Sequence, residues 1–186
     1  RGKQVLHPKG IWYTAVTGIW QTVWLEQVDS AHFTSVHFIP SLDSVEVFVQ
    51  TSESGSVCME VLEEDSCITA HTFTAGGSQT VSFEAPRLWT PEQPFLYRVR
   101  LSLLRAGRET DRVESYFGLR TFAVQPDENG TPYFLLNGRP YFQKGLLDQG
   151  YWPDGLYTAP SDEALRRDIE QAKALGFNML RKHIKV

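Results

Sequence analysis

The chain has 186 residues, with 18 Lys and Arg, 22 Asp and Glu, and a formal net charge of −4. This length suits one medium domain or two small ones and falls short of the about 250 residues of a closed (β/α)8 barrel. With 41% hydrophobic and 22% charged residues, the composition argues against disorder, collagen and coiled coil. Because the chain is mildly acidic and no apolar run approaches the about 20 residues of a membrane span, we expect neither nucleic acid nor a membrane as a partner.

Cysteine and histidine usage predicts no metal and no cofactor. Cys58 and Cys67 are too few for a disulfide framework or a zinc site. They can be two half-buried thiols or a pair across neighbouring strands, and the sequence does not decide between these. Four histidines are scattered without metal-ligand spacing: His7, His32, His37 and His71. No apolar segment follows the first four residues, so no signal peptide is predicted, and the compartment stays open.

The first thirty residues resemble the end of a domain. Residues 18–25 (GIWQTVWL) alternate in their second half, which predicts a strand with apolar groups on both faces. One or two strands cannot bury both faces in water, so we expect preceding strands that complete this domain. The tryptophans Trp12, Trp20 and Trp24 can serve as a carbohydrate platform or simply as core of a sandwich.

From residue 33 to residue 124 the chain reads as regularly spaced short strands. Turn signals every eight to twelve residues separate seven of them, which is typical of an immunoglobulin-like β-sandwich. The predicted strands are 33–39, 45–49, 57–62, 67–73, 80–83, 96–104 and a long mixed segment, 110–124. No Cys–Trp–Cys pattern is present, so an antibody-type domain is not expected.

The last sixty residues predict a hairpin and then a βαβ unit. Asn137-Gly138 supplies the positive φ values of a type I′ turn. Ser161 precedes a helix as its N-cap, with Asp162 and Glu163 in the first turn, and Gly176 stands where a helix-ending glycine belongs. Helical spacing puts one apolar stripe on this helix: Leu165, Ile169, Ala172 and Leu175. A strand from residue 177 then completes a parallel unit with a right-handed crossover.

Several of these segments together resemble glycoside hydrolase family 2, the family of β-galactosidases, β-glucuronidases and β-mannosidases. They follow the family's domain order along the whole chain. The matching segments are residues 18–26 (GIWQTVWLE), 88–97 (LWTPEQPFLY), 117–120 (FGLR), 134–140 (FLLNGRP), 144–145 (KG), 162–167 (DEALRR) and 174–178 (ALGFN).

The resemblance implies a domain organisation. Residues 1–30 would be the C-terminal tail of a jelly-roll sugar-binding domain, and 31–125 an immunoglobulin-like β-sandwich. Residues 126–186 would be the first strand, helix and second strand of an incomplete (β/α)8 catalytic barrel. The expected fold class is therefore mainly β, with a C-terminal βαβ segment from a truncated barrel.

The resemblance also implies a retaining hydrolysis of O-glycosidic bonds by two carboxyl groups about 5 Å apart. In the family these are glutamates after barrel strands 4 and 7, regions that this chain does not contain. No residue of the chain is therefore predicted to be catalytic, and the segment alone is expected to be inactive. The acidic run Glu63-Glu64-Asp65 is interpreted as a charged turn.

Candidate substrate-binding residues follow from the barrel expectation, because barrel active sites lie at the C-terminal ends of the strands. Arg181 matches the family's arginine after strand 2. Asp148 is a candidate acceptor for sugar hydroxyls, Trp152 a candidate stacking group, and His183 a further candidate. The chain departs from well-known β-galactosidases at residues 147–149 (LDQ), where they carry Asn-Arg-His, and at Ile184, where they carry histidine. Galactose specificity is therefore in doubt.

Two alternatives to an enzyme segment stay open: a non-catalytic carbohydrate-binding sandwich and a purely structural sandwich module. The βαβ segment favours the enzyme, because a free-standing module has no use for it. The expected partner of the intact enzyme is a carbohydrate substrate. The apolar stripe on the predicted helix and the tryptophan segment also allow a homo-oligomer.

Overall fold

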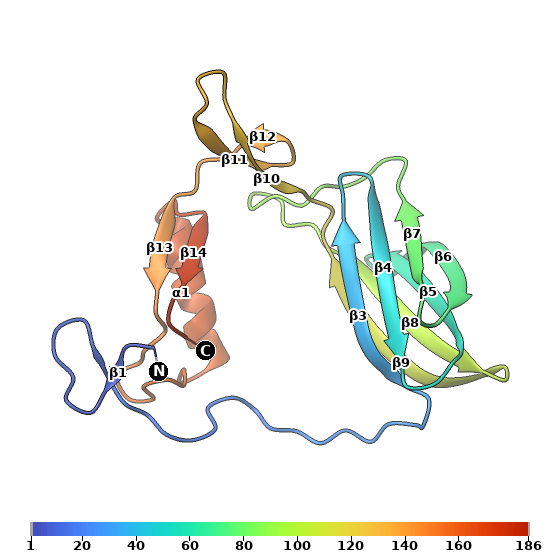
Figure 1. The fold of residues 1–186 in the computed structure, drawn as a ribbon, viewed down its shortest axis with the longest axis horizontal. Coiled ribbons are helices and arrows are strands. Elements are labelled where there is room, and N and C mark those ends of the chain that lie inside the picture. Colours follow the sequence, from blue (N-terminus) through green and yellow to red (C-terminus); the bar gives the residue numbers. More distant parts are fainter. Residues whose placement is uncertain (1, 186) are drawn as a thin grey trace. The chain divides into compact units, whose positions relative to one another are not determined.

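The computed structural model describes residues 2–185 and divides the chain into two compact units (Figure 1). One unit is Glu26–Tyr141; the other joins Arg1–Leu25 to Phe142–Val186. The strands of the first unit are β3 (Phe33–Pro40), β4 (Ser44–Thr51), β5 (Ser56–Glu63), β6 (Ser66–Thr74), β7 (Ser78–Ser82), β8 (Tyr97–Arg105), β9 (Arg108–Phe117), β10 (Phe122–Pro126), β11 (Pro132–Leu136) and β12 (Arg139–Pro140). The second unit holds β1 (Gln4–Val5), β2 (Tyr13–Thr14), β13 (Gly145–Asp148), α1 (Asp162–Ala174) and β14 (Met179–Lys182).

Seven strands form the predicted β-sandwich. One sheet has the order β3-β4-β7 and the other β6-β5-β8-β9, and every pairing in both is antiparallel. The mainly β fold class, with an immunoglobulin-like sandwich and a C-terminal βαβ segment, is thus confirmed. Cys58 and Cys67 are both free thiols. Their strand partners are Thr72 and Leu62 rather than each other.

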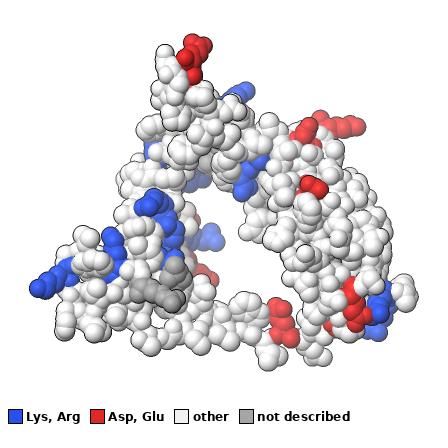
Figure 2. Space-filling view, viewed as in Figure 1, with Lys and Arg blue, Asp and Glu red and all other residues white. Residues whose placement is uncertain are grey.

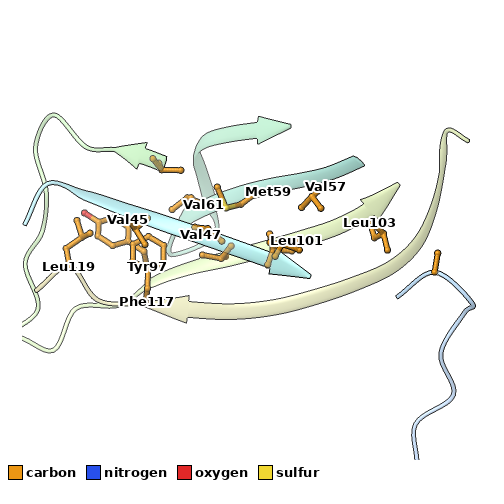
Figure 3. Packing of buried hydrophobic residues seen from close by; sticks show 14 residues of the cluster. Val45, Val47, Val57, Met59, Val61, Tyr97, Leu101, Leu103, Phe117 and Leu119 are labelled. Atoms are coloured by element: carbon orange, nitrogen blue, oxygen red, sulfur yellow. The ribbon is translucent and has the colours of Figure 1, made fainter. Parts of the chain in front are cut away.

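Alternation of apolar residues along β4, β5 and β8 builds the core of the sandwich (Figure 3). Met59 and Leu101, which are register partners, have no exposed surface. The other members of the cluster that are at most 1% exposed are Ala31, Val45, Val47, Val49, Val57, Val61, Val81, Val99, Leu103 and Leu119. Period-two alternation puts these side chains on one face of each strand, where burial of apolar surface stabilises the fold.

Tyr97 fixes one end of the core. Its ring packs against Phe83, Phe95 and Phe117 at centroid distances of 4.8, 4.8 and 5.4 Å. Its hydroxyl accepts a hydrogen bond of 2.9 Å from the backbone N–H of Arg87, ten residues upstream. A tyrosine near the start of this strand that bonds back to upstream backbone is the tyrosine corner of immunoglobulin-like sandwiches.

The predicted long strand 110–124 is wrong, because the chain forms two strands there, β9 and β10. Between them Gly118 lies against Trp89, so close that an added Cβ would be 3.0 Å from the Trp89 Cβ. Asn137 accepts the backbone N–H of Thr121 at 3.0 Å and donates to the Trp89 carbonyl at 3.1 Å. These contacts end the β9 pairing and start the sheet β10-β11-β12. Asn137 and Gly138 have φ values of 52° and 75°, as the predicted turn requires.

The predicted βαβ unit is confirmed: β13 and β14 run parallel, and α1 crosses between them (Figure 1). Ser161 caps α1 by accepting the backbone N–H of Ala164. Gly176 has a φ of 87°, and its N–H donates to the Lys173 carbonyl, which ends the helix.

One expectation about an apolar segment is wrong. Residues 18–25 form no strand, since the structure pairs them with no other strand among residues 2–185, and Trp24 is 71% exposed. On α1 only Ala172 is buried, while Ile169 is 56% and Leu175 77% exposed. No helix among residues 2–185 is long and apolar enough to cross a membrane.

Candidate functional site: the carboxyl ends of two parallel strands

Because β13 and β14 are parallel, their C-terminal ends meet at one edge, and polar side chains gather there. Asp148 and Lys182 are register partners at this edge. The carboxylate of Asp148 accepts a charge-assisted hydrogen bond of 2.7 Å from the Lys182 ammonium. The Asp148 carbonyl accepts the backbone N–H of His183 at 2.9 Å. The edge therefore holds a carboxylate, an ammonium and an imidazole on adjoining positions.

His183 is half-buried beside Gln149. Its ring Nδ1 lies 3.2 Å from the Gln149 Nε2, whose N–H can donate to it in the neutral tautomer. Desolvation first, and then the charges of Arg181 and Lys3, lower the pKa of His183 from the usual 6.5. In that tautomer the Nε2–H of the imidazole can donate to a hydroxyl oxygen.

The four predicted substrate-binding residues all lie in the same compact unit, but the structure joins only two of them. Asp148 and His183 are hydrogen-bonded through the backbone. Arg181 pairs with Leu147 across the two strands and has an exposed side chain. Trp152 belongs to a turn of its own, in which it exchanges backbone hydrogen bonds with Leu156. Its indole Nε1 is buried with no hydrogen-bond partner among the described residues.

An aromatic cluster lies next to this edge. It was not predicted from the sequence, because its members come from the N-terminal and C-terminal parts of the chain. Tyr13 stacks on Tyr151 at 3.8 Å between ring centroids, with an angle of 6° between the planes. Trp20 meets Tyr157 edge-on at 4.7 Å. Burial, and then the neighbours Tyr157 and Tyr13, raise the pKa of Tyr151. A local sequence pattern cannot predict contacts between residues more than 130 positions apart.

Lys185 ties this cluster to the end of β14. Its ammonium donates to the carbonyls of Gly150 at 2.8 Å and Tyr157 at 2.6 Å. The same nitrogen lies 4.9 Å from the Trp20 ring centroid and 4.7 Å from that of Tyr157. Cation–π attraction and two carbonyl dipoles together hold the charge in place. The sequence alone gives Lys182 and Lys185 no predicted role.

Two concave surfaces adjoin the edge. The first, which we call the Trp20 cavity, has a volume of about 470 Å³. It is lined by Trp20, Gln21, Tyr157, Thr158, Ala159, Ser161, Asp162, Leu165, Lys182 and Lys185. The second has about 540 Å³ and is lined by Lys3, Gly10, Ile11, Tyr13, Leu147, Gln149, Gly150 and Tyr151. Among the described residues, no group of three His, Cys, Asp or Glu side chains is arranged to hold a metal ion.

The fold and this edge define a class: an immunoglobulin-like sandwich followed by a parallel βαβ unit with a polar C-terminal edge. Residues 31–120 match the family model described as glycosyl hydrolases family 2. This match covers just under half of the chain.

Similar proteins carry the same family name or glycosidase names. A β-galactosidase of Thermoanaerobacter pseudethanolicus is 26% identical over 185 residues, which cover 91% of this chain and 24% of that protein. A putative β-glucuronidase of Formosa agariphila is 29% identical over 192 residues, covering 95% and 18%. The chain thus spans about a quarter or less of the length of these curated relatives.

Solved structures show the same fold. A glycosyl hydrolase family 2 member from Bacteroides cellulosilyticus superposes with a TM-score of 0.69 at 25% identity, covering 83% of this chain and 22% of the other. A β-glycosidase from Bacteroides vulgatus gives a TM-score of 0.76 at 22% identity, covering 92% and 23%.

Proposed function

We propose that this chain is a segment of a longer retaining glycosidase that hydrolyses O-glycosidic bonds in carbohydrate metabolism. The observation that carries the proposal is the parallel pair β13–β14, whose C-terminal edge bears Asp148 and His183. In the chain this pair follows a sandwich that matches the family 2 model. In a (β/α)8 enzyme, that edge is where substrate binds. The glycosidase names of the relatives support the same reaction class.

The domain organisation remains part of this proposal. Residues 1–30 would close a sugar-binding jelly roll, residues 31–125 form the sandwich, and residues 126–186 begin the catalytic barrel. The sandwich carries no chemistry in this account and positions its neighbours.

At the edge, we assign each predicted residue a binding role. Asp148 accepts hydrogen bonds from sugar hydroxyls with the carboxylate oxygen that Lys182 leaves free. Arg181 projects its exposed guanidinium toward a hydroxyl or the ring oxygen, and His183 supplies a neutral imidazole. The unpartnered indole N–H of Trp152 can donate to a ligand oxygen, and its ring can pack on the apolar face of a sugar.

The acid/base and nucleophile carboxylates of a retaining mechanism, about 5 Å apart, lie outside residues 1–186 in this proposal. The 186-residue chain alone should therefore bind sugars weakly at most and hydrolyse none. A decisive experiment compares this chain with the product of the complete open reading frame on a panel of chromogenic β-galactosides, β-glucuronides and β-mannosides.

We expect hydrolysis of at least one glycoside by the complete product and none by the short chain. Asp148→Ala or Arg181→Ala in the complete product should raise KM or lower kcat/KM by about 10- to 100-fold, the range for losing a charged hydrogen bond. A complete product that binds sugars but cleaves none of the panel would favour the non-catalytic carbohydrate-binding alternative.

A further inference from the structure

Two lysine ammonium groups from the carboxyl end of β14 converge on Gly150, which follows β13. A Cβ added at Gly150 would lie 2.6 Å from the Lys182 Nζ and 3.2 Å from the Lys185 Nζ. The two ammonium groups therefore lie within about 6 Å of each other, a distance at which their charges repel. Gly150 has a φ of 62° and no side chain, so this approach is open only to glycine.

Lys182 and Lys185 have more N–H donors than the hydrogen bonds described above use. Each ammonium carries three N–H groups. Lys182 gives one to Asp148, and Lys185 gives two to the carbonyls of Gly150 and Tyr157. Within residues 2–185, the remaining N–H groups have no recorded acceptor, while both lysines line the Trp20 cavity.

Charge around the pair is predominantly positive. Asp148 offsets Lys182, and Asp162 is the only carboxylate among the residues that line the Trp20 cavity. Lys3 and Arg181 add two further charges, both of which act on His183. Figure 2 shows Lys and Arg atoms gathered over the part of the molecule that Figure 1 labels β13 and β14. Burial, and then the charge of Lys182, lower the pKa of Lys185, against an opposing effect of Asp148. Lys182 is ion-paired with Asp148, whereas no carboxylate among the described residues forms an ion pair with Lys185, so a bound anion can offset the Lys185 charge.

The cavity also offers a surface for the rest of a sugar. The rings of Trp20 and Tyr157 line the same cavity as the lysines. Because Lys185 is held between these rings and two carbonyls, its charge is fixed before any ligand arrives. Preorganisation of this kind lowers the entropic cost of binding.

We propose that Lys182 and Lys185, over Gly150, form a subsite for the anionic substituent of a sugar, a carboxylate or a sulfate, with Trp20 beside the sugar ring. This inference rests on the proposed function for the statement that the ligand is a sugar. It makes the substrate an acidic glycoside rather than a neutral one.

The test uses the complete protein and pairs of chromogenic glycosides that differ only in charge: a β-glucuronide with a β-glucoside, a β-galacturonide with a β-galactoside, and a 6-sulfated β-galactoside. We expect higher kcat/KM for a charged member, and the preferred member tells a carboxylate from a sulfate. Lys182→Met and Lys185→Met should each lower kcat/KM for that member by about 10- to 100-fold while changing the neutral one less than about threefold. Lys173→Met, on exposed helix surface, should change neither.

Equal losses on charged and neutral glycosides would overturn the subsite, since that result marks a structural role for the lysines. Preference for the neutral members would overturn it as well.

A binding measurement separates this inference from the proposed function. Free glucuronate and galacturonate are titrated by calorimetry into the complete protein, against glucose and galactose. Stronger binding of a uronate, weakened by salt and lost in Lys182→Met, would support the subsite even if no glycoside were hydrolysed. Hydrolysis of glycosides together with equal affinity for charged and neutral sugars would refute the subsite while leaving the glycosidase proposal intact.

Discussion

At the scale of single residues, the side chain of Asn137 links two backbone segments that are distant in the sequence. Its side chain bridges the backbones of Trp89 and Thr121 with two hydrogen bonds, and its φ of 52° is one that asparagine tolerates better than alanine. We predict that Asn137→Ala lowers the free energy of unfolding by about 2 kcal/mol, because two backbone groups lose partners. Urea unfolding followed by circular dichroism measures this. Asn129→Ala, in an exposed loop, is the matched control, and equal effects from both would contradict the assignment.

The imidazole of His183 gives a second prediction at this scale. Folding lowers its pKa, so the unfolded chain binds more protons between the folded pKa and 6.5. The contribution of His183 to stability is therefore present above pH 6.5 and is lost as the pH falls through the folded pKa. An NMR titration of its ring protons should show a midpoint below 6.5, and Lys3→Met should raise it. A midpoint at or above 6.5 would show that the desolvation and the charges at the edge are misassigned.

The packing of Leu101 in the sandwich core gives a third prediction at the residue scale. Leu101 lies opposite Met59 with no exposed surface. We expect Leu101→Ala to cost about 3 kcal/mol of unfolding free energy, from lost burial and the cavity left behind. Leu96→Ala, at a position that is 40% exposed, should cost about 1 kcal/mol or less. The same urea unfolding experiment measures both variants. If Leu101→Ala lowers the free energy of unfolding no more than Leu96→Ala does, Leu101 is not part of the core.

At the scale of elements, sequence patterns predicted what local chemistry determines. Short apolar runs bounded by turn signals located six of the seven sandwich strands, and the N-cap Ser161 and the glycine Gly176 marked both ends of α1. The sequence patterns gave wrong predictions where tertiary contacts determine whether a strand forms or ends. The strand break after Phe117 depends on Trp89 and Asn137, both distant along the chain. Residues 18–25 alternate as a strand would, yet they belong to no strand in the described part of the chain, residues 2–185.

In the candidate site, too, some residues could be predicted from local patterns and others could not. Asp148 and His183 were predictable because strand ends of a βαβ unit share one edge. The roles of Lys185 and Gly150 were not, since they depend on how loop 149–158 and the N-terminal segment fold over that edge.

The helix cap is an element-scale prediction. Ser161→Ala removes the acceptor for the Ala164 N–H and should cost about 1 kcal/mol of helix stability. Hydrogen exchange of the amides in the first turn of α1 reports this locally, with Gln171→Ala, exposed in the last turn of the helix, as the control. Unchanged protection in Ser161→Ala would mean that the cap contributes nothing.

At the scale of the whole molecule, the chain combines a buried core with exposed apolar side chains. The sandwich buries a continuous cluster, whereas Leu175 on α1 is 77% exposed and Trp24 in the N-terminal segment is 71% exposed. A homo-oligomer of the 186-residue chain through these surfaces stays a prediction. Light scattering over a range of concentrations should show a mass that rises with concentration, and Leu175→Glu should reduce that rise. A constant monomer mass would contradict it.

The central claim is that residues 1–186 belong to a retaining glycosidase whose catalytic carboxylates lie elsewhere in the polypeptide. Its most direct test treats the complete gene product with a 2-deoxy-2-fluoro glycoside that traps the glycosyl-enzyme intermediate, followed by peptide mass spectrometry. The account predicts one labelled glutamate outside residues 1–186 and no labelling of the isolated chain. A label on a carboxylate within residues 1–186, or none in a protein that hydrolyses the parent glycoside, would contradict it.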